Sequence, residues 1–204
     1  PVVQAAPTPV AKVPAAPTFI KPMGKKDIVD MIRNKPTKNK ILDFVLNQLL
    51  GSLPNDLEVY MGTPMEIVAV MARNHPKVDL GGPREEGVFY QNKVYIKNGS
   101  METLSHELVH VTTYGLILRY YNENMRGLTA GQRDAVRNLE ALMQGFMKLD
   151  GGFEFQGAQI IIQDQLDKGN KAEAVAEYLA WAMTNEEIQE ALSVIPGLAF
   201  LKNM

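Results

Sequence analysis

Residues 104–110 read Leu-Ser-His-Glu-Leu-Val-His, and this stretch contains two of the three histidines in the chain. His106 and His110 are four residues apart, so on a helix their imidazoles lie on one face and can bind one metal ion. Glu107 lies on the adjacent stripe, where its carboxylate can take a proton from a metal-bound water. The stretch predicts a helix with a metal site, and this ligand pattern favours zinc.

Coincidence and two histidines buried in an ordinary core are the alternatives to metal binding. With only 3 His among 204 residues, random placement seldom produces the H-E-x-x-H pattern, and the segment reads as a helix entered from a strand. The residues therefore favour zinc ligation.

The third ligand must come from elsewhere, because a catalytic zinc usually takes three protein ligands and one water. His75 lies in a turn-like Asn-His-Pro sequence, where a surface histidine is the ordinary interpretation. Glu177 is the only charged residue between Ala174 and Met183. A carboxylate in so apolar a helix is costly to desolvate unless a cation compensates for its charge. Glu177 is therefore the predicted third ligand.

Other acids stay open as the third ligand. Glu173 stands beside Lys171 at the edge of the apolar run, where a solvated face is the natural explanation. Asp164 and Glu140 are further candidates, and the site could also lack a third protein ligand.

Composition excludes several classes of protein. The 204 residues carry 21 Lys and Arg against 23 Asp and Glu, a formal net charge of −2, which argues against a strongly basic nucleic-acid binder. The absence of Cys excludes disulfide scaffolds, thiolate zinc fingers, iron–sulfur clusters and cysteine nucleophiles. No apolar run approaches the ~20 residues of a membrane-spanning helix, so we expect a soluble domain with no membrane partner.

The chain divides into two parts. Residues 1–22 contain six of the twelve prolines, and we expect a linker or an arm in extended polyproline II conformation that could lie on a partner. Residues 23–204 form the domain. Because the chain begins with Pro rather than Met, we expect a processed product or a piece of something longer.

Apolar periodicity predicts mostly helices. They are expected near residues 25–35, 41–50, 64–75, 129–149, 171–184 and 186–194, with a further helix that begins at Ser100 and carries the H-E-x-x-H stretch. A short strand at 57–61 and a hairpin with strands 88–90 and 94–96 complete the pattern, and the apolar run 160–162 is ambiguous. The expected fold class is α+β, mainly helical, with a small antiparallel sheet beside the active-site helix.

The H-E-x-x-H stretch, followed by the sequence Glu-Tyr-Leu-Ala-Trp-Ala-Met-Thr-Asn at 177–185, resembles the zincin metallopeptidases that use a glutamate as third ligand. More narrowly, residues 87–196 are similar to peptidase-like domains in large bacteriophage virion and polyvalent proteins. In those domains a Glu-x-x-Ala-Trp helix followed by Thr-Asn supplies the third ligand, which corresponds to Glu177. Thermolysin-like enzymes have an Asp soon after that Glu, whereas this chain has Ala180 and Trp181.

The resemblance implies a hydrolase, a zinc metallopeptidase acting on a peptide or protein substrate. Zinc on His106, His110 and Glu177 would activate a water, and Glu107 would be the general base. Spacing alone would also permit another zinc-assisted amide cleavage. Residues 94–96 would be an edge strand that pairs with substrate, although an ordinary half-buried strand is an equal alternative.

A second hypothesis belongs to a different class. The domain would be a structural or DNA-delivery component of a phage virion that keeps the zincin scaffold with little or no activity, and its arm would contact other virion proteins. The expected location is the phage virion or the host cell cytoplasm. Nucleic-acid binding through Lys35, Lys38 and Lys40 is the weaker interpretation of those residues, which fit a solvated loop face. Trp181 is interpreted as core packing.

Overall fold

The computed structural model describes residues 20–34, 39–77, 86–122, 125–150 and 152–193. The elements over these ranges are β1 (Met23–Gly24), α1 (Lys25–Asn34), α2 (Lys40–Leu49), the 3₁₀ turn η1 (Leu50–Ser52), β2 (Glu58–Gly62), α3 (Pro64–Asn74), β3 (Gly87–Tyr90), β4 (Lys93–Lys97), α4 (Met101–Asn122), α5 (Ala130–Phe146), α6 (Phe153–Asp167), α7 (Lys171–Thr184) and α8 (Glu186–Leu192). The predicted mainly helical α+β class is confirmed. The predicted arm lies almost wholly outside the described residues.

The sheet is mixed rather than wholly antiparallel. Its strand order is β1-β2-β4-β3, with β1 antiparallel to β2 and β3 antiparallel to β4. The central pair, β2 and β4, is parallel, with Val59 beside Val94. A parallel pair needs a crossover, which here contains α3.

The position of β4 corrects one prediction. Residues 94–96 were interpreted either as a substrate-pairing edge strand or as an ordinary half-buried strand. The first interpretation is wrong, because β4 has a strand on each side, and Val94, Tyr95 and Ile96 are fully buried. Among the described strands, β3 is the edge strand beside α4. The predicted hairpin is confirmed. Gln91 and Asn92 both take positive φ angles (50° and 58°) and make its two-residue turn.

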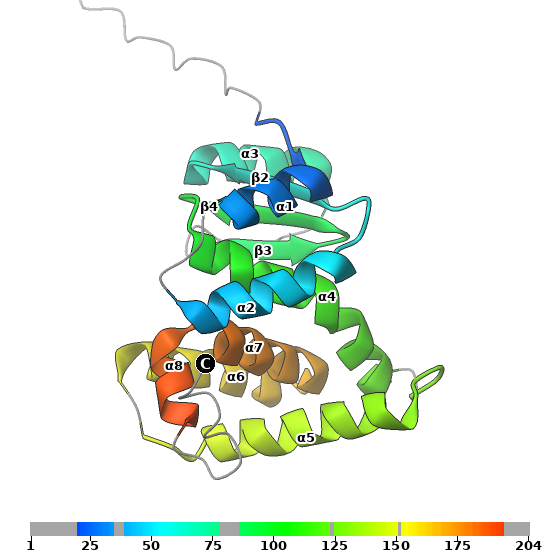
Figure 1. The fold of residues 1–204 in the computed structure, drawn as a ribbon, viewed down its shortest axis with the longest axis vertical. Coiled ribbons are helices and arrows are strands. Elements are labelled where there is room, and N and C mark those ends of the chain that lie inside the picture. The colour runs from blue at the N-terminus through cyan, green and yellow to red at the C-terminus, as the bar shows by residue number, and fades with distance from the viewer. Residues whose placement is uncertain (1–19, 35–38, 78–85, 123–124, 151, 194–204) are drawn as a thin grey trace, which may run out of the picture.

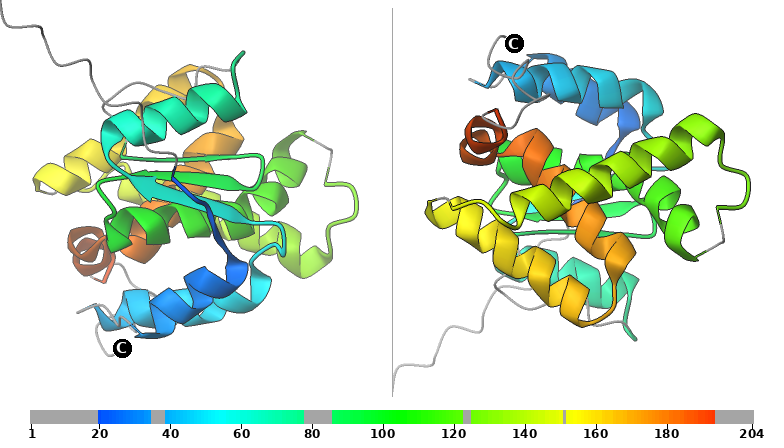
Figure 2. Two further views of the ribbon diagram at one scale, coloured as in Figure 1. Left: turned by 90° about the horizontal axis from the view of Figure 1, so that it is seen from above. Right: turned by 90° about the horizontal axis from the view of Figure 1, so that it is seen from below.

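Helices cover both faces of this sheet (Figure 2). Alternate strand residues face opposite ways, so Val59 and Val94 pack toward α1, α2 and α4, whereas Tyr60 and Tyr95 pack against α3. Leu104 and Leu108 of α4 join the first of these two clusters. The first half of α4 is thereby fixed on the sheet.

The remaining helices, α5 to α8, form a second cluster on the other side of α4 (Figure 1). The buried aromatic rings at its centre are Phe146, Phe155 and Tyr178. Ile117, near the end of α4, belongs to this cluster. The 22-residue helix α4 therefore packs in both halves of the core, the sheet cluster and the helical cluster. Within the described ranges, no helix is long and apolar enough to cross a membrane.

Two helix predictions need adjustment. The ambiguous run 160–162 lies within α6, where Ile162 is buried and Ile160 is 70% exposed. The helix expected to run from 129 to 149 ends at Phe146.

Candidate metal centre

The first turns of α4 direct its histidines away from the sheet. The Thr103 backbone N–H donates to Ser100 Oγ at 3.2 Å, so Ser100 begins the helix as the sequence predicts. Leu104 and Leu108 then face the sheet core, while Val109 packs with Val45 of α2 and Ala180 of α7. The face that carries His106 and His110 therefore lies toward α7.

Small side chains let α7 approach α4 closely. Ala174, Ala176 and Ala180 are all fully buried, and α7 packs more extensively on α4 than on any other helix. Glu177 lies on the α4 side of this interface. The apolar composition that singled out Glu177 in the sequence thus reflects a buried helix with one carboxylate in its interface.

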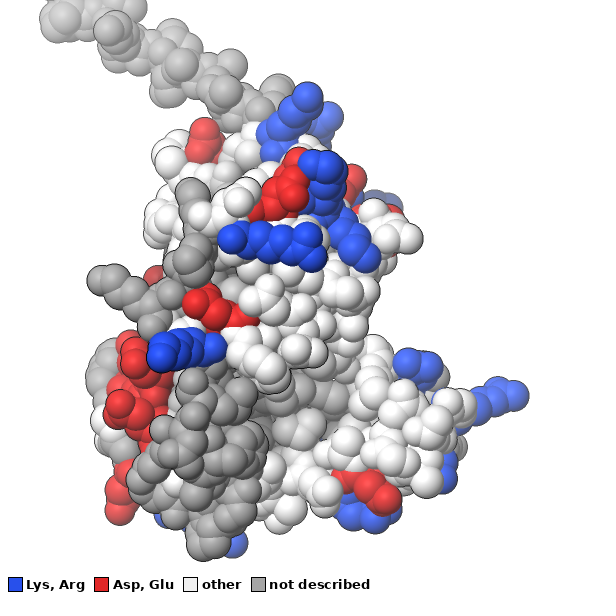
Figure 3. Space-filling model, in the orientation of Figure 1, with Lys and Arg blue, Asp and Glu red and all other residues white. Residues whose placement is uncertain are grey.

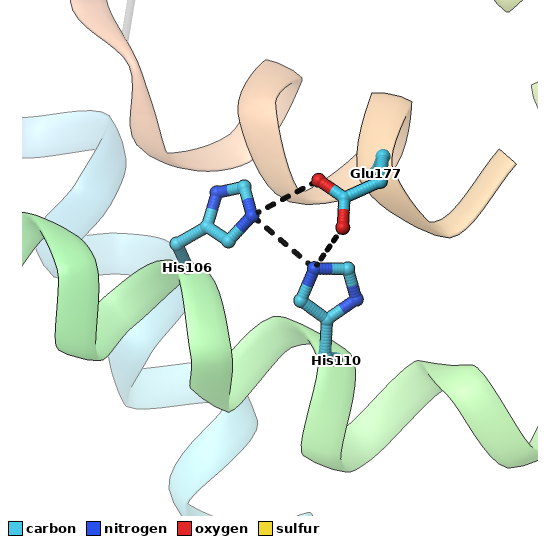
Figure 4. Close-up of side chains that lie close together, drawn as sticks. All are labelled: His106, His110 and Glu177. Atoms are coloured by element: carbon cyan, nitrogen blue, oxygen red, sulfur yellow. Dashed lines mark hydrogen bonds and ion pairs between the residues drawn. The ribbon is translucent and has the colours of Figure 1, made fainter. Parts of the chain in front are cut away.

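The three predicted ligands converge. His106 Nε2 and His110 Nε2 are 3.2 Å apart, and each is 3.4 Å from an oxygen of Glu177. Figure 4 shows the two carboxylate oxygens facing the two imidazoles, one oxygen to each ring. Ligand atoms of all three residues lie within 4.8 Å of one another, so the triad can bind one metal ion.

Electrostatics couple the members of the triad. Burial raises the pKa of Glu177, but its hydrogen bonds to His106 and His110 outweigh burial and hold that pKa far below its usual value. Burial lowers the pKa of His110, and the contact with Glu177 reverses the effect, so the pKa of His110 is raised. The carboxylate is therefore ionised and ready to bind a cation.

The approach of the two imidazoles also suits a cation. Two facing ring nitrogens at 3.2 Å cannot both present lone pairs without repulsion, so either a proton or a shared metal ion must lie between them. Because metal binding requires neutral imidazoles, a metal would replace that proton.

Glu107 lies beside this triad and is not part of it. Its side chain is buried under β3: a Cβ placed on Gly87 would lie 2.6 Å from Glu107 Oε1. Burial raises the pKa of Glu107, and the nearby histidines oppose that rise. The carboxyl is thus next to the metal centre in a poorly solvated space.

The other residues weighed as third ligands have different partners. Glu173 is hydrogen-bonded by Tyr114, and both line a pocket of about 390 Å³ one helical turn from the triad. Glu140 accepts a hydrogen bond from Tyr121 at 2.8 Å and pairs with Lys171. Asp164 pairs with Lys168.

His75 is remote from the triad. Its Nε2 lies 3.0 Å from the hydroxyl of Tyr95, on the sheet face that packs against α3. The sequence suggested a surface histidine at position 75, but His75 is buried. The pKa of His75 is lowered by burial and by the charge of Lys93.

Sequence reasoning missed Trp181 as a neighbour of the centre. Its ring lies 5.0 Å from that of His106, at 70°. The signal was present in the spacing, because Trp181 follows Glu177 by four residues and so shares its face of α7.

Comparison with known proteins gives one informative similarity. No family model matches the chain, and no solved structure matches it. The chain is similar to the virion DNA-directed RNA polymerase of Enterobacteria phage N4, with 30% identity over 156 residues, which covers 65% of this chain. The chain spans only 4% of the length of that relative.

This similarity corrects the predicted function. The relative is an enzyme, but it is a virion RNA polymerase rather than a peptidase, and this finding contradicts the expected metallopeptidase activity. The role of general base assigned to Glu107 depended on that activity. The bacteriophage and virion association in the second hypothesis is the part of the functional prediction that agrees with the similarity.

Proposed function

We propose that this chain is a zinc-binding structural or DNA-delivery domain of a phage virion protein, built on a zincin-like scaffold. His106, His110 and Glu177 would hold the zinc ion and thereby connect α4 to α7. The convergence of these three side chains is the observation that carries the proposal.

The spacing of the ligand atoms supports zinc. Zinc binds nitrogen and oxygen ligands at about 2.0–2.1 Å in a tetrahedron, which separates neighbouring ligand atoms by about 3.3–3.4 Å. The separations here are 3.2 Å between the imidazoles and 3.4 Å from each imidazole to the carboxylate. Two imidazoles with one carboxylate are also a ligand set that zinc accepts readily.

The position of the centre supports a structural role. The triad lies where the sheet-covering half of α4 meets the helical cluster, so an ion there would stabilise the contact between the two halves of the core. The similarity to a virion protein supports the phage assignment. Polymerase chemistry is not part of the proposal, because the chain spans 4% of that relative.

Metal analysis of the purified protein tests the site. Elemental mass spectrometry is expected to find one zinc per chain, lost in His106→Ala and in Glu177→Ala. Two matched controls, His75→Ala and Glu173→Gln, remove a histidine and an acid outside the triad and should leave the zinc content unchanged. Zinc retained by Glu177→Ala would reject the ligand set.

Purified phage particles test the biological role. Peptides from residues 101–122 and 171–184 should be found by mass spectrometry in intact particles. Comparison of full particles with particles that have released their DNA separates the two forms of the proposal: a structural component stays, whereas a delivery component leaves. Absence from full particles would reject both.

A further inference from the structure

Trp181, the one tryptophan of the chain, lies against a predicted metal ligand. Its ring centroid is 5.0 Å from that of His106, and the two ring planes meet at 70°. This is an edge-to-face arrangement, which is favourable between aromatic rings beyond the area that they bury. Since Trp181 follows Glu177 by four residues, one face of α7 supplies both a ligand and this ring.

Aromatic contacts with Trp181 and with His110 are available to orient the ring of His106. Metal-binding histidines are usually oriented by a hydrogen bond to the second ring nitrogen. The polar contacts that the structure gives for His106, within the described residues, all go through Nε2, to His110 and to Glu177. Ring contacts are what remains to set the plane of the imidazole, and Trp181 provides one of them.

The contact with His106 involves the ring of Trp181 and not its nitrogen. The indole Nε1–H is buried and has no hydrogen-bond partner among the described residues. An unpartnered buried donor costs about 1–3 kcal/mol, which a phenylalanine ring in the same space would avoid.

We propose that Trp181 is a positioning residue of the metal centre. Its ring fixes the His106 imidazole in the plane that directs Nε2 toward the ligand atoms of His110 and Glu177. The inference rests on the proposed zinc site and adds a specific cause for its affinity.

Zinc affinity of single variants is the main test, measured by competition with a chromophoric chelator. Trp181→Leu keeps apolar bulk without an aromatic edge and should bind zinc 10–100-fold more weakly, about the loss typical when a group that orients a ligand is removed. Trp181→Phe keeps a ring edge and should retain most of the affinity. Leu179→Ala, on the same helix and also packed in the core, is the control for general destabilisation and should bind as the wild type does.

Cobalt substitution adds a readout that a merely structural role would not change. The visible absorption of bound Co²⁺ depends on ligand geometry, so Trp181→Leu should alter the spectrum, whereas Leu179→Ala should not. If Trp181→Leu does not fold, the wild type still tests the inference: its single tryptophan should change emission when zinc binds.

The outcomes separate the two proposals. A wild-type protein that binds no zinc rejects both the zinc site and the role of Trp181. Stoichiometric zinc with equal affinity in Trp181→Leu, or with unchanged tryptophan emission, rejects only the role of Trp181. A loss in Trp181→Phe as large as that in Trp181→Leu would also reject it, because a ring edge would then not be sufficient.

Discussion

Gly87 of β3 lies close against Glu107 and Thr103 of α4. A Cβ there would lie 2.6 Å from Glu107 Oε1 and 2.8 Å from Thr103 Cγ2, with Glu107 Cγ at 2.9 Å. Because Glu107 is buried, it has little freedom to move aside. We expect Gly87→Ala to lower the free energy of unfolding by about 1–3 kcal/mol, as overpacking typically does, measured by urea denaturation.

Gly115 provides the control within α4 itself. A Cβ at this exposed helical position meets nothing within 4 Å. Gly115→Ala should therefore raise stability by up to about 1 kcal/mol, since alanine is the better helix former. Equal effects of the two substitutions would contradict the steric argument at Gly87.

If His110 binds zinc as proposed, zinc affinity should depend on pH. Burial lowers the pKa of this imidazole, but Glu177 outweighs burial and raises the pKa above its usual 6.5. Below the raised pKa the metal-free site holds a proton on His110, which zinc must displace. Affinity should therefore fall about tenfold per pH unit for each proton released.

Calorimetry checks this expectation. Zinc titrations between pH 8 and pH 6, in buffers with different ionisation enthalpies, should show proton release and weakening affinity toward the acid end. Constant affinity over that range would mean that His110 carries no proton in the metal-free protein.

The sequence singled out the three residues that converge because their signals are local. Two histidines at helical spacing, and one acid in an apolar run, are both visible in single segments. The contact of Trp181 with His106 was missed: the spacing of four residues from Glu177 was a signal for it, but an apolar environment explains a tryptophan equally well. The predicted metallopeptidase activity was wrong for another reason. Residues that can bind a metal show which chemistry a site permits, but they do not show which kind of protein contains the site.

At the scale of elements, α5 is a helix with a well-defined beginning. The Thr129 side chain accepts a hydrogen bond from the Gln132 backbone N–H at 3.2 Å, and the Gln132 side chain accepts one from the Thr129 backbone N–H at 2.9 Å. This is a capping box. The helix contributes Val136, Met143 and Phe146 to the core, so its stability affects the whole helical cluster.

Thr129→Ala removes the capping oxygen and should lower the free energy of unfolding by about 1 kcal/mol. Thr129→Ser keeps the oxygen and should cost much less. Chemical denaturation monitored by circular dichroism compares the two variants. A serine variant as unstable as the alanine variant would show that the methyl group, not the cap, matters.

The elements themselves were predictable to different degrees. The hairpin, the Ser100 cap and the amphipathic helices follow from local patterns. The two-residue strand β1 is too short to leave a pattern, and the parallel pairing of β2 with β4 depends on residues that only the folded chain brings together. The run 160–162 was ambiguous because a continuous apolar run fits a buried strand as well as a helix.

At the scale of the molecule, Figure 3 shows basic side chains gathered toward the α1 end of this face, with acidic side chains among them. The basic residues of α1, Lys25, Lys26 and Arg33, are interspersed with Asp27 and Asp30, and acidic residues gather over α8. Nucleic-acid binders usually show a basic stripe of one sign. The expectation that nucleic acid is not a partner stays a prediction.

The proposed zinc site would make the stability of the whole molecule depend on metal, because it joins the two halves of the core. Zinc at the triad binds only the folded arrangement of α4 and α7, so free zinc at about 100 times its dissociation constant should add about 2.7 kcal/mol. For a chain of this size, that corresponds to roughly 5–10 °C in the midpoint of thermal unfolding.

Scanning calorimetry with zinc and with a chelator measures the shift. His106→Ala is the control and should show no difference between the two conditions. An equal shift in His106→Ala would mean that zinc acts elsewhere on the molecule.

The parallel pairing in the sheet has a consequence for the order of folding. Glu58 and Lys93 are side by side in the sheet but 35 residues apart in the chain, whereas β3 and β4 are joined by two residues. Pairing β2 with β4 first requires the closure of a long loop, which costs entropy before any contact between the two strands stabilises the chain. We therefore expect the hairpin to nucleate first and β2 to dock late. Val88→Ala should then slow refolding, and Val59→Ala should mainly speed unfolding, in stopped-flow chevron measurements. The opposite pattern would mean that the crossover through α3 organises the nascent sheet before its shortest connection does.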